Sequence, residues 1–344
     1  MKQVVAMALA LLLSLFLLPL LLIGEPEKPL ASAETDTPVP TGTLPIDRTV
    51  ITPPPAGGID AGRTVRVLID GQVSPMAMDD YLWCVAAAEM PASFALEAIK
   101  AQVVAARTYT AAKMSYTVQQ HPDADVCSDI TCCQAYISRE DAAQNWGERA
   151  GTYTEAIAQA VTATDGMIAV YDGAPIQAVF FSSAAGRTVD AAEVWGSSVP
   201  YLTGVQSPEG EEVPNYHTTV TLPAEEFKTT LLRQYPDLVL EGEPSSWIGA
   251  ASPNSAGGVA ALSIGGTSLR GEVLRGLFNL RSTNFTLTAQ GDTLTFSVTG
   301  YGHGVGMSQY GANAMAKEGK TWQEIIQWYY TGVTLEPMES TPKS

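Results

Sequence analysis

The stretch MDDYLWCVAAAEMPASFALEAIKAQVVAARTYTAAKM, residues 78–114, predicts two consecutive helices. The aspartates at 79–80 can cap the first helix, and Pro91 ends it because proline disfavours helical geometry in the residue before it. Ser93 is a candidate cap for the second helix, which we expect over residues 95–114, an alanine-rich run without glycine or proline.

Glu89 has an unusual position in this pair. It lies in the last turn of the first helix, where the negative end of the helix dipole disfavours a second negative charge. Its neighbours from Val85 to Ala88 are apolar, so loss of solvent acts in the same direction. Both effects raise a carboxyl pKa, as a general acid near neutral pH requires. An ordinary surface glutamate at a helix end is the alternative interpretation.

Two basic residues lie on the second helix. Lys100 and Arg107 are seven residues apart, or two helical turns, so they should project from one face. Solvated surface charges and ligand contacts both fit this spacing.

The composition limits the class of protein. The chain has 344 residues, enough for about two domains, and 46% of them are hydrophobic. Its 36 acidic and 19 basic side chains give a formal charge of −17, and no basic run is present. Nucleic acid is therefore excluded as a partner, because phosphate binding requires clustered Lys and Arg. Four cysteines are too few for a scaffold built from disulfides.

The N-terminus has the character of a membrane segment. Residues 4–23 are apolar and uncharged, about the length of one bilayer-spanning helix. We expect residues 1–24 to be an uncleaved anchor, with a cleaved signal peptide as the alternative. The positive-inside rule then puts the bulk of the chain outside the cell. Residues 25–55, rich in Pro, Thr and Glu, predict an extended linker.

The same stretch at 78–114 resembles the signature of the stage II sporulation protein D family, in which an acidic-Tyr run leads into AAEMP and then EA-K-Q-VAARTY. The resemblance continues in family order over roughly residues 60–335. The further matching segments are CSDITCCQAY (127–136), the run at 160–196, PYLTGV (200–205), LRGLFNLRSTNFTL (274–287) and the run at 301–333 that begins YGHGVGMSQYGA.

The change in sequence character after about residue 207 predicts an α+β fold in two lobes. A catalytic lobe with helices would comprise residues 56–206 and 300–336. Residues 207–299, with short alternating runs such as DTLTFSVTG, would form a mostly β second lobe. A cleft between lobes is a common place for a long ligand.

The resemblance implies an activity. Members resemble membrane-anchored lytic transglycosylases, which cut peptidoglycan glycan strands during engulfment of the forespore. Hydrolytic glycosidases normally need two carboxyl groups. A lytic transglycosylase instead breaks the bond between N-acetylmuramic acid and N-acetylglucosamine with the sugar's own 6-hydroxyl, which closes a 1,6-anhydro ring. One carboxyl group then suffices, and on the resemblance it is Glu89.

Eight further residues would lie near the glycan. Lys100 and Arg107 would face the lactyl carboxylate or orient Glu89. His303 and Gln309 could bond to sugar hydroxyls from a glycine-dense loop, and Tyr201 could equally belong to the core. Ala185-Gly186 replaces the usual Gly pair of the family. The eight are Lys100, Arg107, Ser182, Ser183, Thr188, Tyr201, His303 and Gln309.

One loop carries a candidate metal site. His121, Cys127, Cys132 and Cys133 supply the donor set of a tetrahedral Zn²⁺ site, although their spacing is not that of a standard finger. With four protein ligands such a zinc would be structural, and none is required for the chemistry. A disulfide from Cys127 to Cys132 or Cys133 is the alternative.

Two functions remain open from the sequence. The first is an enzyme that cuts glycan strands; on the resemblance these would be denuded strands, from which an amidase has removed the stem peptides. The second is a non-catalytic module that binds peptidoglycan and scaffolds other wall enzymes. The resemblance further implies association with stage II sporulation proteins P, an amidase, and M, at the cell membrane.

Overall fold

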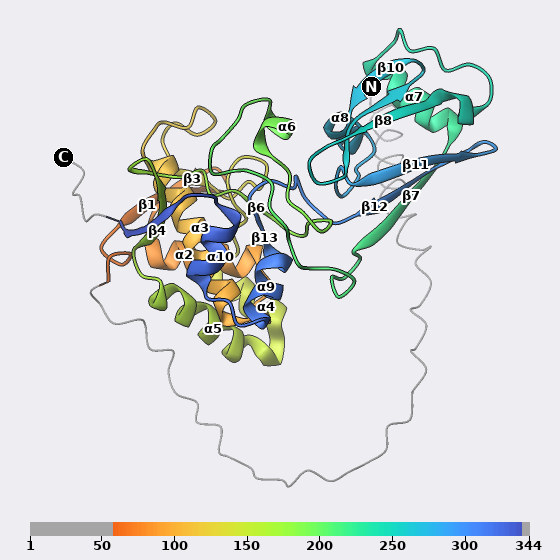
Figure 1. Ribbon diagram of the computed structural model, residues 1–344. Helices are drawn as coiled ribbons and strands as arrows, with labels where there is room; N and C mark the ends of the chain where they lie inside the picture. The colour runs from red at the N-terminus through yellow and green to blue at the C-terminus, as the bar shows by residue number, and fades with distance from the viewer. Residues whose placement is uncertain (1–57, 339–344) are drawn as a thin grey trace, which may run out of the picture. The chain divides into compact units, whose positions relative to one another are not determined.

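The computed structural model describes residues 58–338, which form a mixed α+β structure (Figure 1). This confirms the α+β part of the predicted fold class. Two separate hydrophobic cores are present in this range. None of the helices within 58–338 has the length and apolar character needed to cross a bilayer. The expected anchor at 1–24 and linker at 25–55 lie outside the described residues.

Along the chain, the first part of the larger core is a small sheet. Strands β1 (Thr64–Ile69) and β2 (Gln72–Ala77) form an antiparallel hairpin. Its turn requires positive φ at Asp70 and Gly71, conformations that aspartate tolerates and glycine adopts freely. Strand β3 (Val126–Cys127) adds in parallel to β1, and this places the cysteine-bearing loop beside the sheet.

The predicted helix pair forms the centre of this core. Helix α2 (Met78–Glu89) ends where expected, because Met90 takes the extended geometry that precedes a proline. Helix α3 (Leu96–Met114) begins later than Ser93, whose predicted capping role is wrong. Instead the N-cap residue is Ala95, whose N–H donates to Asn313 Oδ1 at 2.9 Å.

Alanine-rich α3 packs against helices on several sides. Its small side chains let neighbouring helices approach closely, so almost the whole helix is buried. The elements against it are α2, α5 (Ala150–Ala163), α9 (Gln309–Lys317), α10 (Trp322–Tyr329) and β4 (Met167–Tyr171).

Short elements complete the larger core. Strand β4 lies between β5 (Ala174–Pro175) and β14 (Thr334–Pro337). Strand β6 (Phe180–Phe181) pairs in parallel with β13 (Met307–Ser308), and so joins two distant parts of the chain. Helices α4 (Arg139–Trp146) and α6 (Ala191–Trp195) flank these segments in sequence.

The second core lies within residues 222–298. Its elements are the sheet β11-β12-β7 (Phe285–Gln290, Thr293–Thr299, His217–Pro223), the sheet β10-β9-β8 (Thr267–Arg270, Val259–Ile264, Ile248–Pro253), α7 (Ala224–Gln234) and α8 (Gly271–Leu277). Phe227 stacks on Phe278 with ring centroids 4.9 Å apart. This mostly β segment thus has a core of its own.

Candidate active site around Glu89

Glu89 is the last residue of α2, and its side chain is partly buried. Its Oε1 accepts a hydrogen bond from the N–H of Ala135 at 2.6 Å. Burial raises the pKa of this carboxyl above its ordinary value, and the bond from Ala135 lowers it in part. No hydrogen bond from residues 58–338 reaches Oε2. The group is therefore fixed through one oxygen and stays protonated to higher pH than an exposed glutamate.

Gln309 holds the backbone of Glu89. Its Nε2 donates to the Glu89 carbonyl at 2.9 Å and, more weakly, to Gln102 Oε1 at 3.4 Å. Gln309 is the first residue of α9, which Ser308 caps by accepting the N–H of Gly311. The Gln309 side chain is buried and engaged. It positions the end of α2 through Nε2, and its bond to a sugar hydroxyl stays a prediction.

The buried carboxylate of Glu209 stabilises the segments around Ser308 and Gln309. Its Oε1 accepts from the Ala184 N–H at 2.6 Å and from the Ser308 hydroxyl, and its Oε2 accepts from Ser207 Oγ at 2.5 Å. Ser207 also bonds to Tyr329. Sequence reasoning missed Glu209, because nothing in PEGEE distinguishes it from the exposed glutamates that follow.

Arg107 lies elsewhere and corrects an expectation. Its side chain is fully buried, and its guanidinium pairs with Asp60 at 2.6 Å. It also donates to Thr164 Oγ1 and to the Met167 carbonyl. With no exposed surface it cannot contact a ligand or orient Glu89. Arg107 and Asp60 form a structural ion pair in the interior of the protein.

Lys100, unlike Arg107, is not fully buried. Its Nζ bonds to Glu97 Oε1 at 2.6 Å, and Glu97 Oε2 accepts the N–H of Trp322 at the start of α10. Lys100 retains limited exposure. The pair links α3 to α10.

Of the four predicted site residues between positions 182 and 201 that carry a hydroxyl, Thr188 and Tyr201 have a hydrogen-bond partner for it in the fold. Thr188 is buried, and its Oγ1 exchanges bonds with the backbone of Val205, which corrects its expected role near the glycan. Ser183 is also buried, with no partner for its hydroxyl among the described residues. The Tyr201 hydroxyl accepts the N–H of Gln177. Ser182 is partly exposed, and no side chain within residues 58–338 bonds to its hydroxyl.

His303 is a neutral structural residue. Its Nε2 lies 3.1 Å from the Phe180 carbonyl, which can only accept, and its Nδ1 accepts the N–H of Val305 at 3.1 Å. Burial first, and then the charge of Arg275, lower its pKa to about 4. Both ring nitrogens are used by the backbone, so the expected bonds from His303 to sugar hydroxyls are corrected.

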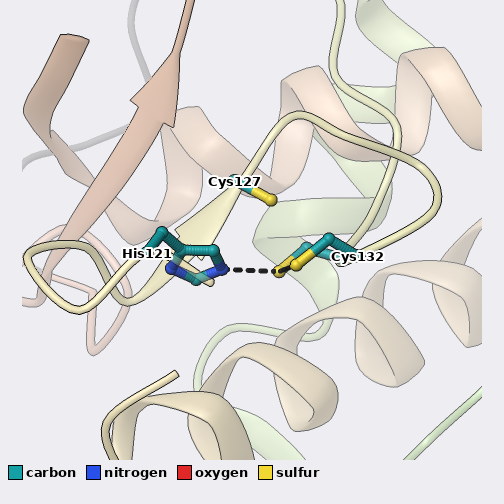
Figure 2. Close-up of side chains that lie close together, drawn as sticks. His121, Cys127 and Cys132 are labelled. Carbon is teal, nitrogen blue, oxygen red and sulfur yellow. Dashed lines mark hydrogen bonds between the residues drawn. The ribbon is translucent and has the colours of Figure 1, made fainter. Parts of the chain in front are cut away.

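The four predicted metal ligands come together. Their ligand atoms all lie within 4.8 Å of one another, and His121 Nε2 is 3.3 Å from Cys133 Sγ (Figure 2). The Cys132 and Cys133 sulfurs are 4.0 Å apart. Ligand atoms of a tetrahedral zinc lie about 3.3–3.8 Å apart. All four cysteines in the described range are free thiols in this structure.

The surroundings of this cluster also fit a metal. His121 Nδ1 lies 3.1 Å from the Ala124 carbonyl, so the Nδ1–H tautomer turns the Nε2 lone pair toward the thiols. The loop continues from Cys133 to Ala135, whose N–H bonds to Glu89. The residues present therefore fit Zn²⁺, and the cluster is joined to the candidate site by two peptide units.

Comparison with known proteins identifies the family. The family described as Stage II sporulation protein matches residues 71–171. The Stage II sporulation protein D of Bacillus subtilis is 38% identical over 270 residues, 78% of this chain and 77% of that protein. Its counterpart in Bacillus amyloliquefaciens is 36% identical, with 78% and 76% covered. The Amidase enhancer of B. subtilis is 31% identical over 72% of this chain and 39% of that protein. Identity and coverage together show that the chain belongs to the stage II sporulation protein D family.

Proposed function

We propose that this protein is a lytic transglycosylase that cuts peptidoglycan glycan strands, with Glu89 as its single acid and base. The observation that carries the proposal is the Glu89 carboxyl, held by one oxygen, with a raised pKa and its second oxygen unengaged by residues 58–338. Membership of a sporulation-related cell-wall family supports the substrate class.

The mechanism follows from that geometry. The protonated Glu89 gives its proton to the glycosidic oxygen, and the bond from that oxygen to C1 of N-acetylmuramic acid breaks. The same sugar's 6-hydroxyl attacks C1, and the Glu89 carboxylate takes its proton. No water is consumed. The Ala135 N–H stabilises the transient carboxylate, as an N–H donor to a developing charge does.

A bound zinc would have a structural role in this scheme. His121, Cys127, Cys132 and Cys133 would hold it, with all four positions filled by protein. Zinc supplies folding energy at such a site and no catalysis. The loop it would brace leads to Ala135, and so keeps the donor to Glu89 in place.

The proposed setting is the cell membrane. Residues 1–24 would be a single anchor with the bulk of the chain extracytoplasmic, where glycan is found. The substrate would be denuded strands, and stage II sporulation proteins P and M would be partners. The family resemblance supports each of these proposals.

The test compares purified full-length wild type with Glu89→Gln on denuded glycan, with Glu212→Gln as an exposed control. We expect wild type and Glu212→Gln to release anhydro-muropeptides, and Glu89→Gln to lose about 10²–10⁴-fold, the usual worth of a general acid-base. Activity should also fall as pH rises through the raised pKa of Glu89, because the acid form is needed. If Glu89→Gln retains wild-type activity, the assignment of Glu89 is wrong.

A scaffold is the second candidate function. The relative named Amidase enhancer favours it, since that name describes action through another enzyme. A scaffold would bind glycan, raise the activity of an added amidase and release no anhydro product. That combination in the wild-type protein would replace the enzymatic proposal.

A further inference from the structure

Two exposed aromatic side chains flank His303. Trp195 ends α6, and its ring centroid is 5.9 Å from that of His303. Tyr301 lies two residues before His303 in the same loop. Both Trp195 and Tyr301 are 47% exposed. Exposed apolar side chains mark a binding surface where they gather in one patch.

An unpaired arginine lies on this surface. The guanidinium of Arg281 stacks on the Tyr301 ring at 4.2 Å from its centroid. Within residues 58–338 it makes no ion pair, although the chain has 36 acidic side chains against 19 basic ones. Arg270 lies next to Trp195 through a bond to the Val194 carbonyl. Each of the two exposed aromatic residues thus has an arginine beside it.

Three acidic groups in and around α6 and α8 already have partners. Glu272 pairs with Arg275, and Glu193 accepts the N–H of Ser255 at 2.8 Å. Asp190 accepts the N–H of Ala192 at the start of α6. None of these carboxylates bonds to Arg281, which is partly exposed and whose buried Nε has no hydrogen-bond partner among the described residues.

Backbone contacts connect this surface to Glu89. Tyr301 and Ser183 exchange hydrogen bonds at 3.0 and 2.8 Å, and the next residue back, Ser182, accepts the N–H of Tyr310. Tyr310 follows Gln309, which holds Glu89. The ring of Tyr310 packs edge-on against Phe94, with ring centroids 4.9 Å apart.

Backbone hydrogen bonds thus join the segment of Tyr301 to the segment of Tyr310, which follows Gln309. His303 supports Trp195, because its ring lies between Phe181 and Trp195 and both of its nitrogens are held by the backbone. A rigid, neutral support keeps Trp195 in place as a flat platform.

We infer that Trp195, Tyr301 and Arg281 form a subsite for a part of the glycan strand remote from the bond that is cut. The apolar faces of sugar rings pack on aromatic side chains, and the planar guanidinium of Arg281 pairs with the carboxylate of a muramic acid residue. A polymer of sugar rings with one carboxylate in each disaccharide offers ring faces to the two aromatic side chains and a charge to Arg281. The inference rests on the proposed function, since it takes glycan as the ligand.

The test measures binding by titration calorimetry to the full chain carrying Glu89→Gln, so that the ligand survives. The ligands are denuded glycan and a neutral N-acetylglucosamine oligomer of equal length. Trp195→Ala should weaken both about tenfold, and Arg281→Gln should weaken only the denuded glycan, about fivefold at low salt and less at high salt. Trp195→Phe should retain most of the affinity because it keeps a ring.

Matched controls lie elsewhere on the chain. Trp328 is also 47% exposed, on α10, and Arg233 is an exposed arginine on α7; Trp328→Ala and Arg233→Gln should bind as the parent does. Thermal unfolding checks that each variant is folded. If the parent binds glycan but Trp195→Ala matches Trp328→Ala, the subsite is wrong while the proposed function stands. If the parent binds neither ligand, the proposed function itself fails.

Discussion

Glu209→Gln tests whether the buried carboxylate holds the site together. The carboxylate accepts from Ala184, Ser207 and Ser308. In Glu209→Gln, the new amide keeps one acceptor oxygen. Its NH₂ group then faces a partner that is itself a hydrogen-bond donor. A hydrogen bond to a charged group contributes about 1.5–3 kcal/mol against about 0.5–1.5 for a neutral one. Three weakened bonds, offset by relief of charge burial, correspond to about 2 kcal/mol of unfolding free energy.

The assay for this prediction is urea unfolding of the full chain, with Glu212→Gln as the exposed control. The control should stay within about 0.5 kcal/mol of wild type. Because Ser308 caps α9 and Gln309 holds Glu89, Glu209→Gln should also lower kcat for anhydro-product release about tenfold or more, with KM little changed. Unfolding free energy and kcat equal to those of Glu212→Gln would refute the reasoning.

Three further predictions concern residues outside the Glu209 network. As pH falls from 6.5 toward about 4, the unfolding free energy of wild type should decrease relative to that of His303→Gln, by at most about 1.4 kcal/mol per pH unit. The reason is that His303 binds a proton in the unfolded chain but not in the folded protein over this range. Equal pH dependence of the two proteins in denaturant titrations would contradict this. Asp60→Asn should cost about 3–5 kcal/mol by leaving the Arg107 charge buried, and the double variant Asp60→Leu/Arg107→Met should cost less; calorimetric unfolding that ranks them in reverse would refute it. Metal analysis should give one zinc per chain and chelation should lower Tm, whereas less than one zinc with fewer free thiols than cysteines would exclude the metal.

Local chemistry made part of this structure predictable. Pro91 ends α2, so the sequence alone placed Glu89 at a helix terminus. Its apolar sequence neighbours indicated the burial that raises its pKa. The donor types of the Cys-rich loop likewise predicted which four side chains would converge. In each case the deciding interactions lie within a few residues.

Depth in the fold was not predictable in this way. The seven-residue spacing of Lys100 and Arg107 fixes a helix face, but α3 is packed on several sides, so a face does not indicate exposure. Arg107 is buried because Asp60, 47 residues earlier, pairs with it. A family motif indicates which residue types recur, but it does not indicate which partner each side chain contacts in the folded protein.

Long-range partners hid the roles of two other residues. Glu209 meets Ser308 across 99 positions, and Gln309 meets Glu89 across 220. A glycine-dense loop with histidine suggested ligand contact at His303, but the backbone of β6 uses that ring instead. Such partners become visible only when the chain is folded.

Cleavage in isotopically labelled water tests the central claim most directly. Full-length wild type digests denuded glycan in water enriched in heavy oxygen, and mass spectrometry reads the new sugar ends. If Glu89 both donates and accepts the proton while the 6-hydroxyl attacks, the products end in anhydro rings and carry no label. Labelled reducing ends would show that water is the nucleophile, and would contradict the account.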